Sequence, residues 1–435
     1  IGAFALEVLN AGNTYNTAIG FNAGAVMTTG VQNTIIGSFA GDALTTGEYN
    51  VAIGYAALST EDAYGRNVAI GHEALKTLNA VTDAYNVAIG YAAGELMSTG
   101  IRNTLMGGFA GDALTTGGYN TAIGMQALST ETGGTQNVAI GTGALELLNV
   151  NAAGNNTAVG YLAGQLMSTG TQNTLIGGLT GDAISTGQQN TAIGYNALSA
   201  ETTGSYTVAI GRGALAGQNF AASETSYNTA VGYEAGNDVT DGQENTFLGA
   251  LAADAVTTAD ANTALGAYAL GAETTGGHNT AVGRSALSGQ NAAADTYNTV
   301  VGSNSTTALS TGDFNTIMGA ASAGALTTGA RNVVIGYEAL KDEDTTGRVV
   351  AIGYGALANQ NTPNNSYNVA IGYNASNLSV AGAENTIVGS FAGDAITSAG
   401  NVVLMGVHAG GALTLGGANV AIGHSALRNE TDYGN

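Results

Sequence analysis

The sequence contains no cysteine and few basic residues. The absence of cysteine excludes disulfide scaffolds, thiolate zinc sites and thiol catalysis, and it leaves the redox compartment open. Nine lysines and arginines stand against 31 acidic residues, which gives a formal net charge of −22. Because phosphate binding requires clustered Lys and Arg, this balance argues against nucleic acid as a partner.

Long apolar runs are also absent, although 44% of the residues are hydrophobic. No stretch of 18 consecutive apolar residues occurs, so we expect no membrane span in this segment. Only 9% of the residues are charged, unlike an acidic disordered tail. The 68 glycines do not recur at every third position, which excludes collagen. The chain begins at Ile1 within a repeated motif, without Met or a signal peptide, so we expect a segment of a longer repetitive protein.

A five-residue motif, Asn-[Thr/Val]-aliphatic-[Ile/Val/Leu/Met]-Gly, recurs along the whole chain, first at 16–20. Its glycine, the landmark glycine, occurs 24 times, and Ile1-Gly2 has the form of the end of a twenty-fifth copy. Three spacings of 17 residues alternate with one of 19 or 21, so four repeats form a unit of about 70 residues. Short regular repeats of this kind are typical of solenoids. The landmark glycines are 20, 37, 54, 71, 90, 107, 124, 141, 160, 177, 194, 211, 232, 249, 266, 283, 302, 319, 336, 353, 372, 389, 406 and 423.

Each repeat predicts one rung of a parallel β-solenoid. The motif is β-branched and aliphatic, too short for a helix, and bounded by turn residues. We expect a strand over Asn-Thr-Ala-Ile, a corner at the glycine, and a second short strand near positions equivalent to Ala40–Leu44. The fold class is therefore all-β: a parallel β-solenoid (β-roll or β-helix) of about 25 rungs, ~4.8 Å apart, continuous over residues 1–435 as a single repeat region.

The strand is apolar on both faces, which indicates that both faces are covered. Positions are counted from the landmark glycine. Position −1 is always Ile, Val, Leu or Met and −3 is Thr or Val, so we expect this face to form the core. Position −2 is also always apolar, and we expect it to pack against other copies of the chain in a homotrimer; a wide single solenoid is the alternative. Position −2 is enlarged in every fourth repeat, at Ile35, Leu105, Leu175, Phe247, Ile317 and Ile387.

Position −4 is Asn in 21 of the 24 repeats. Asparagines stacked at this position can bond amide to amide from rung to rung, as they do in cross-β assemblies. We expect a structural ladder. The exceptions are Thr207, Val349 and Val402.

The run from Asn190 to Gly204 resembles the 17-residue repeats of tail-fibre-domain proteins of phages and bacteria. The motif is also similar to the Asn-Ser-Val-Ala-Ile-Gly repeats in the heads of trimeric autotransporter adhesins, which form trimeric left-handed parallel β-rolls. The resemblance extends over essentially the whole chain. It implies a homotrimeric fibre of a virion or a cell surface. The repeat differs from the adhesin heads in its length of 17 residues with a 19-residue fourth member.

Two sets of acidic residues recur with the repeats. A glycosidase needs one pair of carboxylates in a unique pocket. A carboxylate that recurs every 70 residues is therefore interpreted as a solvated or capping turn residue. Ion binding between rungs is an alternative. Five residues after their glycines lie Asp42, Asp112, Asp182, Asp254 and Asp394, with Gly324 the one absence. Seven residues after theirs lie Glu61, Glu131, Glu201, Glu273 and Glu343.

The histidines and the glycine-rich stretches give no site. His72, His278, His408 and His424 occur at different offsets and lack ligand spacing, so we expect surface or turn residues. The stretches 211–216 and 353–358 match a relaxed dinucleotide fingerprint, but no crossover helix is expected after them. No catalytic, cofactor-binding or metal-binding residue is assigned, and no cofactor is expected.

Tyrosines and longer loops are the candidate contact points. We expect the tyrosines to pack between rungs or subunits, with stacking on sugars as the alternative. They lie after the glycine at Tyr55, Tyr91, Tyr161 and Tyr195, and before the asparagine at Tyr49, Tyr85 and Tyr227. The longer loops are 79–85, 149–155, 219–227, 291–297 and 361–367, with glycosylation sequons at Asn155-Asn-Thr157 and Asn364-Asn-Ser366.

Together these features favour a structural fibre shaft rather than an enzyme. We expect an extracellular location, on a phage tail fibre or a bacterial adhesive filament, with the chain itself as the main partner and surface glycans as possible ligands. A polysaccharide-cleaving tailspike is one alternative, although no non-repeating insertion carries a carboxylate pair. An ice-binding solenoid is another, although Val51, Val68 and Val87 interrupt the threonines at position −3.

Overall fold

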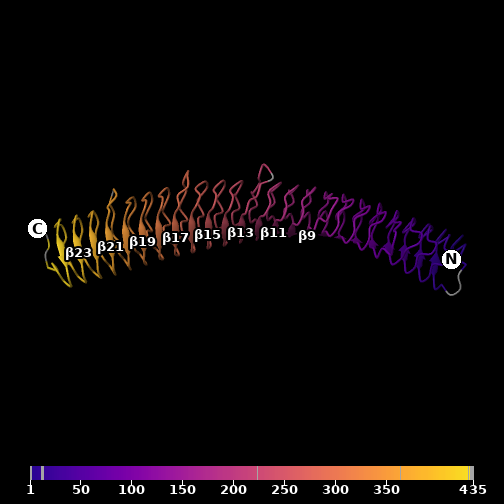
Figure 1. Cartoon of the computed structure of the whole chain (residues 1–435), viewed down its shortest axis with the longest axis horizontal. Helices are drawn as coiled ribbons and strands as arrows, with labels where there is room; N and C mark the ends of the chain where they lie inside the picture. Colours follow the sequence, from indigo (N-terminus) through magenta and orange to yellow (C-terminus); the bar gives the residue numbers. More distant parts are fainter. Residues whose placement is uncertain (1, 11–13, 223, 363, 430, 432–435) are drawn as a thin grey trace. The chain divides into compact units, whose positions relative to one another are not determined.

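The computed structural model describes residues 2–10, 14–222, 224–362, 364–429 and 431. Within them the chain is all-β and contains no helix, and a parallel β-solenoid with the 17-residue repeat is confirmed. The chain forms two compact units, 1–225 and 226–435. In each unit successive rungs lie side by side with their strands in parallel (Figure 1).

The first unit contains strands β1 to β12, each three residues long. Each strand from β1 to β11 pairs with the next in sequence, and equivalent repeat positions are partners, as with Thr17 and Thr34. Their bounds are β1 Thr17–Ile19, β2 Thr34–Ile36, β3 Val51–Ile53, β4 Val68–Ile70, β5 Val87–Ile89, β6 Thr104–Met106, β7 Thr121–Ile123, β8 Val138–Ile140, β9 Thr157–Val159, β10 Thr174–Ile176, β11 Thr191–Ile193 and β12 Val208–Ile210.

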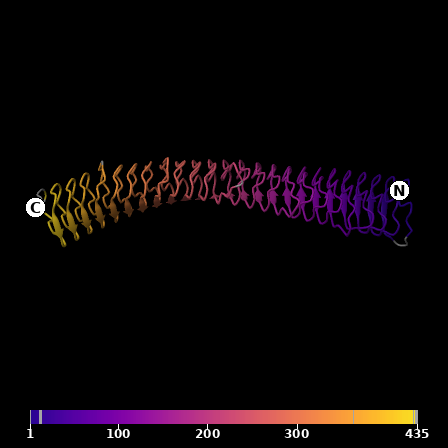
Figure 2. The same ribbon diagram turned by 45° about the horizontal axis from the view of Figure 1, so that its top comes forward.

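The second unit contains β13 to β24 in the same arrangement. In the turned view its strands follow one another along one side of the rungs (Figure 2). Their bounds are β13 Thr229–Val231, β14 Thr246–Leu248, β15 Thr263–Leu265, β16 Thr280–Val282, β17 Thr299–Val301, β18 Thr316–Met318, β19 Val333–Ile335, β20 Val350–Ile352, β21 Val369–Ile371, β22 Thr386–Val388, β23 Val403–Met405 and β24 Val420–Ile422.

The rest of each rung consists of turns, so the prediction of a second short strand near Ala40–Leu44 was wrong. The turns contain left-handed residues at positions +2 and +4 and before the asparagine; in the third rung these are Ala56, Leu58 and Arg66. Their N–H groups donate to carbonyl oxygens of the neighbouring rungs at 3.0 Å. These bonds join the rungs without a second sheet, and they offset the cost of the left-handed backbone.

The asparagines at position −4 form a buried ladder, as predicted. Asn33 is typical: its main-chain N–H donates to Oδ1 of Asn16 at 2.8 Å, and its Nδ2 donates to the carbonyl oxygen of Gly47 at 2.9 Å. Direct amide–amide contacts are longer, 3.2 Å between Asn33 and Asn16. Each asparagine therefore ties its rung to the next through the main chain more than through amide pairing. Thr207 and Val349 still donate their N–H to the preceding asparagine, at 2.9 and 3.0 Å.

The core lies on the opposite face of the strand from the one predicted. Position −2 is buried inside its own chain, as at Ile35 and Ala52, both 0% exposed. Positions −3 and −1 are half-buried or exposed and point outward. A position that is fully buried within one chain cannot be the seam between chains. The interpretation of position −2 as an intersubunit contact was therefore wrong.

The enlarged side chains at −2 fill space left by glycine at position +4. A Cβ added to Gly24 or Gly41 would lie 3.2 Å from Cδ1 of Ile35. In rungs where position −2 is Ala, as at Ala52, position +4 can hold a buried leucine such as Leu58. Volume is conserved across the core in this way, as close packing requires. The four-rung period is a packing period within the chain.

Candidate functional site

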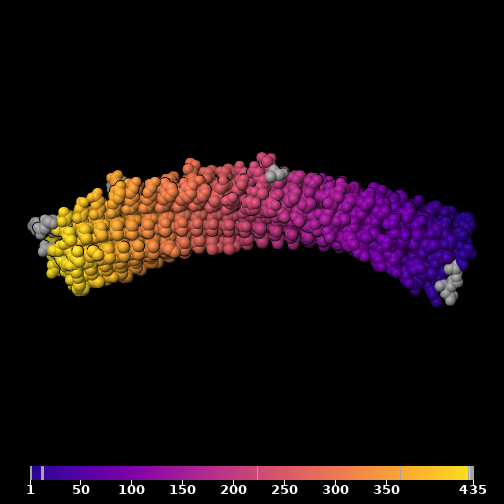
Figure 3. Space-filling view, viewed as in Figure 1, coloured from indigo at the N-terminus to yellow at the C-terminus, as the bar shows by residue number. Residues whose placement is uncertain are grey.

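The outward face of the strands, defined as positions −3 and −1, is a candidate interaction surface in each unit. It carries two parallel columns, one of Thr or Val and one of Ile, Val, Leu or Met. No strand contains a charged residue, although the chain as a whole carries −22. Leu248 and Met318 on this face are 45% and 46% exposed. In the space-filling view, exposed side chains of the second unit form straight rows from rung to rung (Figure 3).

An aromatic column borders this face at the corner after the landmark glycine. The rings of Tyr55 and His72 stack with centroids 5.0 Å apart, and His72 stacks on Tyr91 at 5.2 Å. In the second unit Tyr337, Tyr354 and Tyr373 stack in the same way. The predicted packing between rungs is confirmed for Tyr55 and Tyr91, while about half of the surface of each residue remains exposed.

The residue before the asparagine forms a second column along the other border. The Arg66 guanidinium lies over the rings of Tyr49 and Tyr85, 5.2 and 5.6 Å from their centroids. It also forms an ion pair with Asp83, which lies in the longer loop 79–85. Oδ1 of Asp83 accepts the N–H of Gly65 at 3.3 Å. The loop therefore adds side-chain bonds to the rung that precedes it.

The periodic glutamates are buried turn caps. Oε1 of Glu131 accepts the N–H groups of Gly134 at 2.7 Å and Gly133 at 3.2 Å, and Oε2 accepts the N–H of Val150 in the next rung at 3.0 Å. Burial raises the pKa of the Glu131 carboxyl, and these hydrogen bonds lower it in part. The capping role predicted for these residues is confirmed, but their side chains are excluded from solvent rather than solvated. The others of the set, Glu61, Glu201, Glu273 and Glu343, are also 0% exposed.

The periodic aspartates are half-buried in the turns. Burial raises the pKa of Asp112, and a bond to its own main-chain N–H opposes this shift. Its Oδ1 is buried without a hydrogen-bond partner, as are those of Asp42, Asp182 and Asp394. Oδ1 of Asp254 is not among these buried, unpartnered atoms, although burial raises the pKa of Asp254 too. These carboxylates lie in separate four-rung units and do not converge.

The four histidines lie apart on the surface. His278 stacks on Tyr297 with centroids 4.8 Å apart, and its Nδ1 lies 3.3 Å from Oδ2 of Asp295. His408 stacks on Phe391, and His424 is exposed. Within the described ranges no group of three or more histidines or acidic residues could hold a metal ion.

The remaining sequence candidates are parts of the rungs. Gly211 and Gly353 are landmark corners that follow β12 and β20, and turns rather than helices come after them. Asn155 of one sequon is exposed, whereas Ser366 of the other is buried and bonded to Gln360. Of the longer loops, 291–297 projects between β16 and β17 (Figure 1). Positions 223 and 363 of two loops, and Ile1 of the partial motif, lie outside the described residues.

The part of the chain that the structure describes has no helix long and apolar enough to cross a membrane. No protein-family model matches the chain, and no curated protein is similar to it in sequence.

Proposed function

We propose that the chain is a structural segment of an extracellular fibre, and that three copies associate through the outward faces of their strands. The observation that supports this proposal is the uncharged outward face in a chain of net charge −22. With ~4.8 Å between strands and ~3.3 Å per residue, the face of one unit covers roughly 600 Å². Its column of Ile, Val, Leu and Met at position −1 is a continuous exposed apolar stripe, and such stripes mark interaction surfaces.

The area of the two units is sufficient for stable association. Together they offer roughly 1,200 Å² per chain, more than the ~800 Å² that each partner of a standard interface buries. A face three residues wide is narrow enough for three copies to close around an axis, consistent with the resemblance to trimeric fibre repeats. The aromatic columns at its borders would then lie at the rim, where they remain accessible to surface glycans.

Native mass spectrometry and light scattering test the assembly. We expect a particle of three times the 42.8 kDa chain mass. Replacing Ile176 and Ile193 by lysine places charges on the outward face, and we expect this variant to run as a single chain with an unchanged circular dichroism spectrum. The matched control is Ser199→Lys, five residues after its landmark glycine, where a sibling rung carries Lys341. A wild-type monomer at micromolar concentration would overturn the proposal.

Ice binding is a second candidate, because the threonine column at position −3 does face outward. Val51, Val68 and Val87 interrupt it. Thermal hysteresis of the wild-type chain, lost on changing Thr246 and Thr263 to lysine, would favour this role over the fibre.

A further inference from the structure

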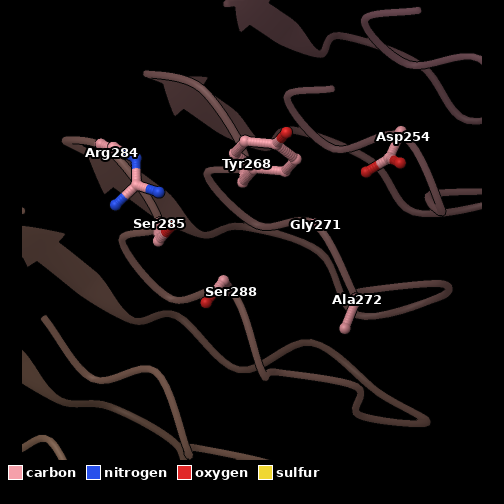
Figure 4. Close-up of a pocket in the computed structure, with 7 residues that line it drawn as sticks. All are labelled: Asp254, Tyr268, Gly271, Ala272, Arg284, Ser285 and Ser288. Atoms are coloured by element: carbon pink, nitrogen blue, oxygen red, sulfur yellow. The ribbon is translucent and has the colours of Figure 1, made fainter. Parts of the chain in front are cut away.

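The second unit contains a surface hollow of about 460 Å³ beside the turns of β14 to β16. This volume is within the range of small-ligand sites. In the close-up, Tyr268 lies in the middle, with Arg284 on one side and Asp254 on the other (Figure 4). Ser285 and Ser288 add two hydroxyl groups to its wall. Only one carboxylate lines the hollow, whereas glycoside hydrolysis uses a pair, so its chemistry suits binding.

The internal repeats show why the hollow occurs here. Position +5 of the third rung is serine in the first three four-rung units, at Ser59, Ser129 and Ser199, but it is Gly271 in the fourth. A Cβ on Gly271 would lie 3.5 Å from Oδ1 of Asp254. The missing side chain therefore opens the space next to this carboxylate.

The equivalent aspartate of the sixth four-rung unit provides a comparison. Asp394 also faces a glycine, Gly411, whose added Cβ would lie 3.5 Å from its Oδ1. There the aliphatic part of Arg428 covers the gap, with Cγ 3.6 Å from that Cβ position, and Oδ1 of Asp394 is buried. Ser288 occupies the position of Arg428 in the fourth unit and is too short to cover the gap. Asp254 thus faces the hollow.

Arg284 supplies a cation that the rest of the site does not neutralise. Its Nη1 donates to Oδ1 of Asn304 at 3.3 Å. No carboxylate of the described residues lies within ion-pair distance of its guanidinium. The Tyr268 side chain is 47% exposed at the centre of the site. An aromatic surface flanked by a guanidinium, a carboxylate and hydroxyls matches a sugar that carries an acid group.

We propose that this hollow binds one uronic acid unit of an acidic glycan. The pyranose ring rests on Tyr268, its carboxylate pairs with Arg284, and its hydroxyls donate to Asp254 and exchange hydrogen bonds with Ser285 and Ser288. The assignment rests on the proposed extracellular role, where such glycans occur, but it requires no particular oligomeric state.

Titration calorimetry of the full chain with sodium glucuronate tests the site. The titrations are carried out in 150 mM NaCl, where the Debye length is ~8 Å, so that the net negative charge of the chain is largely screened from the anionic ligand. We expect a dissociation constant on the order of 1 mM, and methyl glucoside, which lacks the acid group, should bind at least tenfold more weakly. Tyr268→Ala and Arg284→Gln should each weaken glucuronate binding at least tenfold. Gly271→Ser, which restores the residue of the sibling rungs, should block the hollow to a similar extent.

The matched control is Arg212→Gln, since Arg212 holds the position of Arg284 in the preceding four-rung unit, where Ser199 is present. This variant should bind as wild type does. Absence of glucuronate binding, equal binding of methyl glucoside, or unchanged binding by Gly271→Ser and Arg284→Gln would each overturn the proposal. A monomer that binds glucuronate would support this site and refute the proposed trimer. A trimer that does not bind glucuronate would support the trimer and refute this site.

Discussion

Gly124 packs directly against Gly141 in the next rung: a Cβ added to Gly124 would lie 2.5 Å from the carbonyl carbon and oxygen of Gly141. Its φ of +137° is in addition a conformation that residues with a side chain rarely adopt. Steric contact and backbone conformation thus both require glycine at this corner.

Gly124→Ala should therefore lower the free energy of unfolding by about 3 kcal/mol or more. Gly108→Ala is the control, because a Cβ at Gly108 meets nothing within 4 Å. We expect the control to remain within about 0.5 kcal/mol of wild type. Urea unfolding of the two variants makes the comparison, and equal midpoints would contradict it.

Glu131→Ala should destabilise the chain because it leaves the N–H groups of Gly133, Gly134 and Val150 without their acceptor. Each buried unsatisfied donor costs ~1–3 kcal/mol, so we expect a loss of about 3 kcal/mol in total. Glu131→Gln keeps one acceptor oxygen and should fall between alanine and wild type. The exposed Glu48 provides the control: Glu48→Ala should leave the melting temperature almost unchanged. A melting temperature of Glu131→Ala equal to that of this control would refute the capping role.

Leu105→Ala should cost about 3 kcal/mol, the usual loss for a buried leucine. Gly111→Leu alone should also destabilise, since a Cβ there would lie 2.9 Å from Cδ2 of Leu105. The double variant gives this rung, which has Leu114 at position +7, the combination found in the fourth rung, Ala69 with Leu75 and Leu78. We therefore expect it to recover at least half of the combined loss. Strictly additive unfolding energies would show that the two positions do not share one space.

Stability should fall as the pH rises from 4 to 7. Burial raises the pKa of Asp42, Asp112, Asp182 and Asp394 above the unfolded value of ~3.9. The folded chain therefore holds these protons more tightly than the unfolded chain. Their contribution is fully present below the unfolded pKa and is lost as the pH rises through the folded pKa.

Asp112→Asn should raise the urea midpoint at pH 7 and reduce the difference between pH 4 and pH 7. Asp62→Asn, at an exposed position, is the control and should change neither. Measurements in 1 M salt remove most of the general repulsion from the net charge. A midpoint that rises from pH 4 to pH 7 in wild type would contradict the prediction.

The sequence predicts the fold class because the period, the landmark glycine and the asparagine each have one structural explanation. It does not tell which face of the strand is inside, because side chains such as Ala52 and Ile53 are both apolar and alternation carries no signal. The size difference between them is the usable clue, since small residues at −2 face leucines such as Leu58. The left-handed backbone of Leu58 was not predictable either, because bulky residues rarely adopt it.

The hollow was missed for a different reason. Periodicity directs attention to what recurs, whereas this site arises from a local departure, Gly271 in place of serine with the short Ser288 beside it. Aligning the four-rung units with one another reveals that departure, and the structure is needed to show that Arg284 and Asp254 lie on either side of Tyr268.

The enlarged core residues also bear on how the chain avoids mispairing during folding. If β5 paired with β7 and skipped β6, Gly94 would lose Leu105, whose Cδ1 lies 2.8 Å from the position of its Cβ, and a void would remain. A skip of four rungs would pair β5 with β10 and place Leu175, the equivalent of Leu105, against Gly94. The entropic cost of closing the expelled loop grows only slowly with its length. Side-chain packing therefore rejects single-rung errors but not four-rung errors. Repeat proteins are expected to fold by growth outward from a first pair of adjacent rungs. This order of folding avoids both single-rung and four-rung pairing errors.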